Sequence, residues 1–335
     1  MSRYNTIAEQ EWRSRARANN KGRLAAALPL LVMAVYLYGL RPLALAAAAV
    51  VTAVLCDLIA AGLRRRAWDR GDVSSILFAV LLVCLMPASV PYHVVVVSVS
   101  SAILVGKHLF GGAESYPFHP TALGFLFAVI SWPGHVLSFP APLTPLAMGN
   151  VVPFTAVETP VVTLKLGGLP NLSDINVILG NFGGPLGACA TLVVLACGLM
   201  LLAVRRFDLA MPLGFAAGCV GVVCVFPRIA GAGRADLLFM ELMVGGLAFG
   251  AVFLLQDEIT SPYGPVARVL YGLVVGIAAM GYQYYGSFPF GICFGVLCGN
   301  AISGVFEHLG EILRRGVSGA ASGKKKTEKG GELPE

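Results

Sequence analysis

The chain has 335 residues, of which 57% are hydrophobic and only 13% are charged. A soluble domain carries about 25% charged residues, so this composition excludes an ordinary soluble protein and predicts an integral membrane protein. The net charge of +6 does not indicate nucleic-acid binding, because the charges lie in short loops and at the two ends of the chain. Membrane topology requires that placement.

Ten apolar segments follow one another along the chain. A bilayer core about 30 Å thick needs about 20 helical residues, and ten segments approach that length. They are 24–40, 43–63, 73–87, 91–106, 119–134, 186–204, 211–227, 236–256, 265–285 and 289–307. The third and fourth are short and bounded by prolines, which leaves broken or re-entrant helices open there. The sequence predicts an all-α membrane protein with about ten transmembrane helices.

The basic residues indicate the orientation of these helices. With the N-terminus in the cytoplasm, 20 of the 24 Lys and Arg residues lie on the cytoplasmic side and 4 lie on the other side. This bias predicts that both termini are cytoplasmic and that the loop 135–180 is external. The N-terminus is polar and basic for too long to be a cleavable signal. The predicted divisions are a basic N-terminus 1–23, a five-helix half 24–134, an external loop 135–185, a second half 186–307 and a polar tail 308–335.

The two halves repeat weakly. CLMPASVPY (Cys84–Tyr92) and LQDEITSPY (Leu255–Tyr263) each precede an apolar run at corresponding places. Five helices per half is an odd number, so the halves would have opposite orientations in the membrane. This is the inverted-repeat pattern of transporter-like folds, in which the site lies where interrupted helices meet.

Three acids fall within or at the end of apolar segments: Asp57 in VLCDLIAAG, Glu241 in FMELMVGG and Asp257 in QDEITSP. A charge at the bilayer centre costs about 2.5–3.5 kcal/mol or more, so these acids indicate a path for a cation or a proton. Snorkelling, or pairing with a neighbouring helix, is the alternative. For Asp257, capping of the next helix by Ser261 would also explain the polar cluster.

Two irregular stretches are candidate binding elements. GNFGGPLG (Gly180–Gly187) opens the sixth segment, and Gly183 and Gly184 would let the backbone approach a phosphate. Tight entry into a packed helix is the alternative. In FGGAESYPFHP, Tyr116 and Phe118 could stack on a ring or simply pack. The chain has no P-loop, no GxSxG and no HExxH motif.

Three stretches in order resemble the D subunit of the Rnf electron-transport complex and, more distantly, the B subunit of the sodium-pumping Nqr complex. They are KHLFGGAESYPFHP (Lys107–Pro120), GNFGGPLG and DEITSP (Asp257–Pro262). The resemblance covers about residues 24–310. It implies an inner-membrane subunit of a redox-driven ion pump that couples electron flow between ferredoxin and NAD to movement of sodium ions or protons. The implied partners are iron–sulfur and flavin subunits of the same complex.

The resemblance also implies a covalent FMN, esterified through its phosphate to a threonine in an external loop. Thr159, in FTAVETPVVTLK, stands at the matching place, and Thr155 and Thr163 are weaker candidates. In this picture Gly183 and Gly184 approach the phosphate. The chain departs from the family pattern at several positions. Ala156, Val157 and Glu158 replace Ser-Gly-Ala before the threonine, His119 replaces Asn, Pro185 replaces Ser, and Ala188 stands where an acid is usual.

Two other functions stay open from the residues. The altered context of Thr159 also fits a flavin-free scaffold subunit of the same complex, since a carboxylate beside the acceptor would repel the incoming phosphate. The inverted five-helix repeat also fits a stand-alone channel or carrier for a small polar solute, which would bind no flavin and need no partners.

Overall fold

The computed structural model describes residues 3–65, 67–112, 115–229, 231, 233–286, 290–310 and 312. Most of the predicted polar tail, 308–335, therefore lies outside the described residues. The described part is mostly helical, and its only strands are one pair of two residues each. The predicted all-α class is confirmed.

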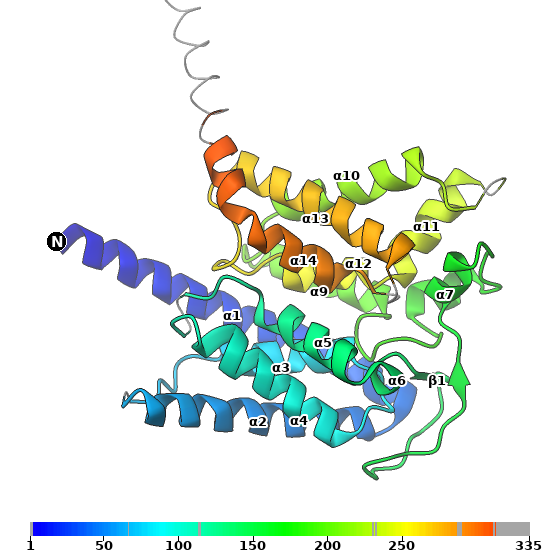
Figure 1. Ribbon diagram of the computed structural model, residues 1–335, viewed down its shortest axis with the longest axis horizontal. Helices are drawn as coiled ribbons and strands as arrows, with labels where there is room; N and C mark the ends of the chain where they lie inside the picture. The colour runs from blue at the N-terminus through cyan, green and yellow to red at the C-terminus, as the bar shows by residue number, and fades with distance from the viewer. Residues whose placement is uncertain are drawn as a thin grey trace, which may run out of the picture.

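The first half of the chain forms one group of packed helices, in the lower part of Figure 1. Its elements are α1 (Arg3–Tyr38), α2 (Arg41–Leu63), α3 (Ser74–Leu85), α4 (Tyr92–Ser100), the π-helix η1 (Ser101–His108) and α5 (Pro120–Ser131). Helix α2 packs on α3 and α4, while α5 packs on α3, α4 and η1. Prolines begin α2 and α5 at the first turn, where no backbone N–H is needed.

The second half forms the upper group in Figure 1. Its elements are α9 (Thr191–Ala203), α10 (Ala210–Val225), α11 (Arg234–Val244), α12 (Leu247–Phe249), the π-helix η2 (Gly250–Leu254), α13 (Pro265–Tyr285) and α14 (Ile292–Ala301). Helix α11 meets the α12–η2 segment at a bend of 61°. Gly246 stands at the bend with φ +65°, a conformation that favours glycine. A second bend of 59° follows α14.

Short elements join the halves and gather at one end of the molecule, at the right of Figure 1. They are α6 (Pro133–Val136), β1 (Phe139–Pro140), β2 (Ala156–Val157), α7 (Pro160–Lys165) and α8 (Asp174–Leu179). The strands pair antiparallel, with Phe139 opposite Val157. This pair holds the loop that carries Thr159 close to the end of α5.

Among the described residues, three helices are long and apolar enough to cross a membrane: Ser14–Tyr38, Arg41–Leu63 and Pro265–Tyr285. Counting each bent pair as one span raises the number to five. The remaining apolar helices have 10–17 residues. Each of the ten predicted segments contains one of these helices, and three to five of them have the length of a full span.

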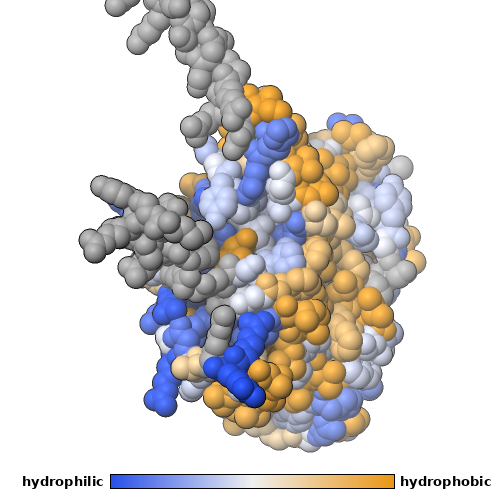
Figure 2. Space-filling view, turned by 60° about the vertical axis from the view of Figure 1, so that its left-hand side comes forward, coloured by the Kyte–Doolittle hydropathy of each residue, from blue (hydrophilic) through white to orange (hydrophobic). Residues whose placement is uncertain are grey.

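Large apolar side chains cover much of the surface. Figure 2 shows a broad apolar area with hydrophilic side chains gathered beside it. Val32 is 70% exposed, Leu63 is 80% exposed and Leu199 is 66% exposed. A soluble monomer rarely exposes such an area, whereas a bilayer is a suitable solvent for it.

Candidate functional site

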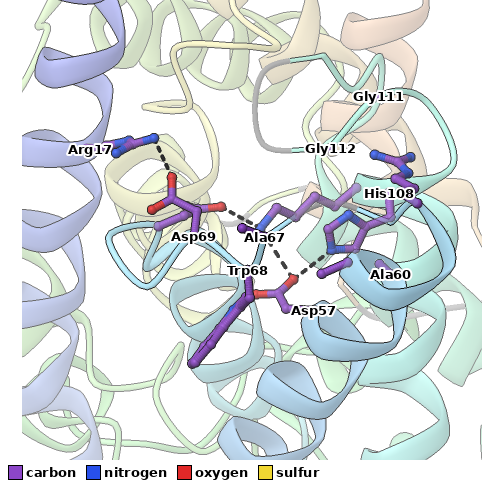
Figure 3. A pocket seen from close by; sticks show the side chains of 13 residues that line it. Arg17, Asp57, Ala60, Ala67, Trp68, Asp69, His108, Gly111 and Gly112 are labelled. Atoms are coloured by element: carbon purple, nitrogen blue, oxygen red, sulfur yellow. Dashed lines mark hydrogen bonds and ion pairs between the residues drawn. The ribbon is translucent and has the colours of Figure 1, made fainter.

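Asp57 lies in a polar network between α2, α3 and η1 (Figure 3). Its Oδ1 accepts a hydrogen bond from the Ser75 hydroxyl at 2.8 Å and lies 2.7 Å from His108 Nε2. The Lys107 ammonium lies 3.6 Å from the same oxygen and donates to Ser75 Oγ at 2.6 Å and to Asp72 Oδ2 at 2.8 Å. Lys107 is 1% exposed, so one buried cation serves two carboxylates.

This network borders a cavity of about 340 Å³, which lies at the end of the helices away from β1 and α7. Arg17 of α1 reaches Asp69 across the mouth, with 2.5 Å between Nη2 and Oδ2. Arg64 and the two glycines that follow η1, Gly111 and Gly112, complete this side of the wall. Basic and acidic side chains therefore line this cavity together, and we call it the vestibule.

The ionisation of Asp72, in the loop before α3, depends on Lys107. Burial by itself raises the pKa of Asp72, but the Lys107 charge and the hydrogen bonds from Lys107 and Ser74 outweigh burial. The net result is a pKa below the ordinary value of 3.8. Asp72 is therefore a carboxylate at neutral pH, and its attraction to Lys107 stabilises the fold.

Asp257 lies in a second buried network that joins the two halves. Tyr116 donates to its Oδ1 at 3.0 Å, and Thr260 donates to its Oδ2 at 3.1 Å. Arg23 of α1 lies 3.6 Å from Oδ1 and donates to the carbonyl oxygen of Phe253 at 2.5 Å. The side chains of both Arg23 and Asp257 are 2% exposed. Ser261 bonds to carbonyls of its own turn and does not contact this carboxylate in the described hydrogen bonds.

Glu241 of α11 is fully buried beside the 61° bend. The Arg228 guanidinium lies 3.3 Å from its Oε1, and Gln283 of α13 donates to its Oε2 at 2.7 Å. Arg228 also lies over the ring of Tyr284, 4.0 Å from the centroid. A cation–π contact of this kind strengthens a desolvated pair.

The structure therefore places the three predicted acids in three separate networks, each with its own cation. Each acid therefore has a basic partner from another segment of the chain, which is compatible with the pairing alternative left open by the sequence. Sequence reasoning did not find the partners Arg23, Arg228 and Lys107. Lys107 carried the one available signal, a lysine at the end of an apolar segment, since such a residue needs an acid when it is buried.

Thr159 lies just before α7, at the end of the molecule that holds β1 and β2. Its side chain is 3% exposed, and its hydroxyl oxygen has no hydrogen-bond partner among the described residues. A buried hydroxyl without a partner costs about 1–3 kcal/mol, and an ester oxygen needs no donor bond. On this observation, Thr159 fits a covalent anchor. Thr155 is exposed and Thr163 is half-buried.

Gly183 and Gly184 pack against the same loop and the start of α9. A Cβ on Gly183 would come under 3.0 Å from the Val157 side chain, and one on Gly184 would come equally close to Cys189 Sγ. A side chain at either position would therefore have to displace Val157 or Cys189, which is compatible with the close-packing alternative to phosphate binding. The chain does not bring Tyr116 and Phe118 to Thr159, because they precede α5 while the β1–β2 pair follows it.

The chain is similar to known proteins over most of its length. The chain is 28% identical over 300 residues to the D subunit of the ion-translocating oxidoreductase complex of Pseudomonas paraeruginosa, in an alignment that covers 85% of this chain and 87% of that protein. It is 27% identical over 298 residues to the D subunit of the Na(+)-translocating ferredoxin:NAD(+) oxidoreductase complex of Acetobacterium woodii, covering 88% and 89%. The proton-translocating counterpart of Clostridium ljungdahlii is 25% identical over 299 residues, covering 86% and 88%.

The family model described as NQR2, RnfD, RnfE matches residues 13–312. The match takes in the vestibule, both buried networks at the helix breaks and the loop with Thr159, and it confirms the predicted resemblance to the Rnf D subunit. The chain belongs to the NQR2, RnfD, RnfE family.

Proposed function

We propose that this chain is the membrane subunit of an Rnf-type, redox-driven ion pump that helps couple electron transfer between ferredoxin and NAD to movement of a cation. The observation that carries the proposal is the family match over residues 13–312. The paired acids buried in its apolar helices support it, because charges at bilayer depth mark ion and proton pathways. Its partners are the iron–sulfur and flavin subunits of the complex.

The proposal includes ten membrane crossings in two inverted repeats, in the cell inner membrane, with both termini cytoplasmic and the loop 135–180 external. The distribution of basic residues supports the orientation. The helix pairs support the repeat. In the first half the second helix, α2, packs on the fourth, α4, and in the second half α10 packs on α13 in the same way. The third and fifth elements also meet in both halves, as α3 with α5 and as η2 with α14. The two halves meet where α1 contacts α9 and where α5 contacts α14. The first helix of one half therefore contacts the first helix of the other, and the fifth contacts the fifth.

The proposal also includes FMN esterified to Thr159. The unpartnered, buried hydroxyl supports it, and the packing of Val157 on Gly183 would hold the anchor in place. FMN supplies a carrier for one or two electrons. A flavin-free subunit of the same complex is the second candidate. Two observations favour it: Glu158 stands next to the acceptor, and the acceptor side chain is only 3% exposed to an incoming transferase.

Flavin fluorescence of the denatured protein on a gel separates these two candidates. The chain is co-expressed with a flavin transferase, as wild type, Thr159→Val and the matched control Thr163→Val. We expect fluorescence in the wild type and the control and none in Thr159→Val. Fluorescence that persists in Thr159→Val would exclude this anchor, and a dark wild type would support the flavin-free subunit.

Membranes of cells that lack the chain test the pump itself. We expect ferredoxin-dependent reduction of NAD to disappear and to return when the chain is restored. Electron transfer that does not require the chain would overturn the proposal. Solute uptake by the purified chain alone would support a stand-alone channel or carrier instead.

A further inference from the structure

The identity of the cation can be argued from the oxygen atoms that the fold leaves available. A sodium ion in a membrane protein is held by carboxylates and by the carbonyls of unwound helices. Each of the three buried acids has a cation within 3.6 Å in the described structure. Asp57 faces Lys107, Asp257 faces Arg23 and Glu241 faces Arg228.

The carbonyls at the break between α3 and α4 are also occupied. Arg41, fully buried, donates from Nε to the carbonyl oxygen of Ala88 at 2.7 Å and from Nη2 to that of Val90 at 2.9 Å. The carbonyls of Cys84 and Met86 accept backbone N–H groups from 186–188, just before α9. A sodium ion at this break would have to displace a guanidinium.

At the break after η2, the backbone carbonyls also already accept hydrogen bonds. Arg23 occupies the carbonyl of Phe253, and the Ser261 hydroxyl occupies that of Leu255. Beside the third break, Glu241 Oε1 and Gln283 Oε1 have no hydrogen-bond partner among the described residues. The Arg228 guanidinium stands 3.3 Å from that Glu241 oxygen, so a sodium ion there would face a full positive charge.

His119, unlike these backbone carbonyls, has polar atoms without a partner among the described residues. It immediately precedes α5, it is 0% exposed, and neither of its ring nitrogens has a hydrogen-bond partner among the described residues. Phe78 lies against its ring, with the centroids 5.3 Å apart, and also against Tyr116 at 5.7 Å. A buried imidazole with two free nitrogens is a proton-binding group, whereas nitrogen is a poor ligand for a hard cation.

The complete burial of His119 opposes a charge on its ring. Of the charged groups near it, Asp257 attracts a proton on the ring and Arg23 repels it. The other titratable neighbours are Tyr116, which is bonded to Asp257, and Tyr271, whose hydroxyl lies 2.6 Å from the Asn300 side chain. That amide also lies 2.9 Å from the backbone nitrogen of His119. A small change in the Arg23–Asp257 pair would therefore change the affinity of the ring for a proton.

We propose that the cation moved with this subunit is a proton and that His119 binds it on the way. The proposal rests on the proposed function as a pump subunit. One proton from the cytoplasmic side forms an N–H bond on the free ring nitrogen and is released toward the other side. The imidazole is unchanged after the cycle, and a net single positive charge has moved.

The test uses the whole complex in proteoliposomes, supplied with reduced ferredoxin and NAD. Electron transfer, acidification and uptake of radioactive sodium are measured separately, with sodium removed and then restored. We expect acidification that needs no sodium, collapses with a protonophore and is not accompanied by sodium uptake. Sodium uptake coupled to electron transfer would overturn the proposal and leave the proposed function standing. Absence of electron transfer in the wild-type complex would instead count against the proposed function.

The variant His119→Asn, which places the family's usual residue at this position, tests the role of the ring. The control is His135→Asn, an exposed imidazole in α6. We expect His119→Asn to lower proton movement per electron about a hundredfold, the scale of a lost proton-transfer group, and the control to leave it unchanged. Normal pumping by His119→Asn would exclude the role. If this variant fails to assemble, the sodium dependence of the wild type still decides the identity of the ion.

Discussion

Helices α10 and α13 approach each other through glycines on both sides. Gly214 and Gly218 on α10 face Gly272 and Gly276 on α13, with each pair spaced four residues apart. Spacing of this kind lets two membrane helices approach until their backbones touch. A Cβ on Gly218 would lie under 3.0 Å from the carbonyl oxygen of Leu273, where ordinary contact begins near 3.4 Å.

The substitution Gly218→Ala should therefore force the helices apart by at least several tenths of an ångström. Insertion of a methyl group into a well-packed interface costs about 1–3 kcal/mol. Alanine also favours a helix by about 1 kcal/mol over glycine, which would mask part of this loss. Gly221→Ala cancels that gain, because Gly221 lies in the same helix with nothing within 4 Å of its added Cβ.

The assay is thermal unfolding of the two purified variants in the same detergent. We expect Gly218→Ala to be less stable than Gly221→Ala by about 1–3 kcal/mol. At roughly 2–4 °C per kcal/mol, the apparent melting temperature should be several degrees lower. Equal melting temperatures would refute the reasoning, because they would mean that the two backbones are not in contact at Gly218.

Two further predictions concern buried charges. Asp72→Asn should remove the stability that the lowered pKa of Asp72 contributes. In the wild type that contribution is present above about pH 4 and is lost as the pH falls through the folded-state pKa of Asp72. The variant should therefore lose less stability than the wild type between pH 7 and pH 3, measured by unfolding at each pH. An unchanged pH profile of stability would exclude the pair with Lys107 as the source of this contribution. Arg41→Lys should lower the free energy of unfolding by about 1.5–3 kcal/mol, because an ammonium cannot reach the carbonyls of both Ala88 and Val90. Equal resistance of the variant and the wild type to thermal unfolding would contradict this geometry.

The sequence predicted a large part of the fold for a simple physical reason. Apolar segments of helical length indicate helices that lie in a bilayer. Local composition therefore predicted the positions of the helices, the assignment as a membrane protein and the acids within the apolar segments. The family resemblance implied that the loop with Thr159 lies near Gly183, and in the structure Val157 of that loop packs on Gly183. The bend of 61° beside Gly246 was not predicted, since the sequence predicted one apolar segment over 236–256.

The partners of the buried charges could be found only from the tertiary structure. His108 is 51 residues from Asp57, and Tyr116 is 141 residues from Asp257. Local patterns show that a buried charge needs compensation, but they do not show which distant group supplies it. Tertiary packing decides whether an oxygen is free for a cation or already bonded to a guanidinium, and whether the ring of His119 is left without a partner. Membrane insertion is a property of each segment, while the chemistry of the ion path arises from contacts between segments.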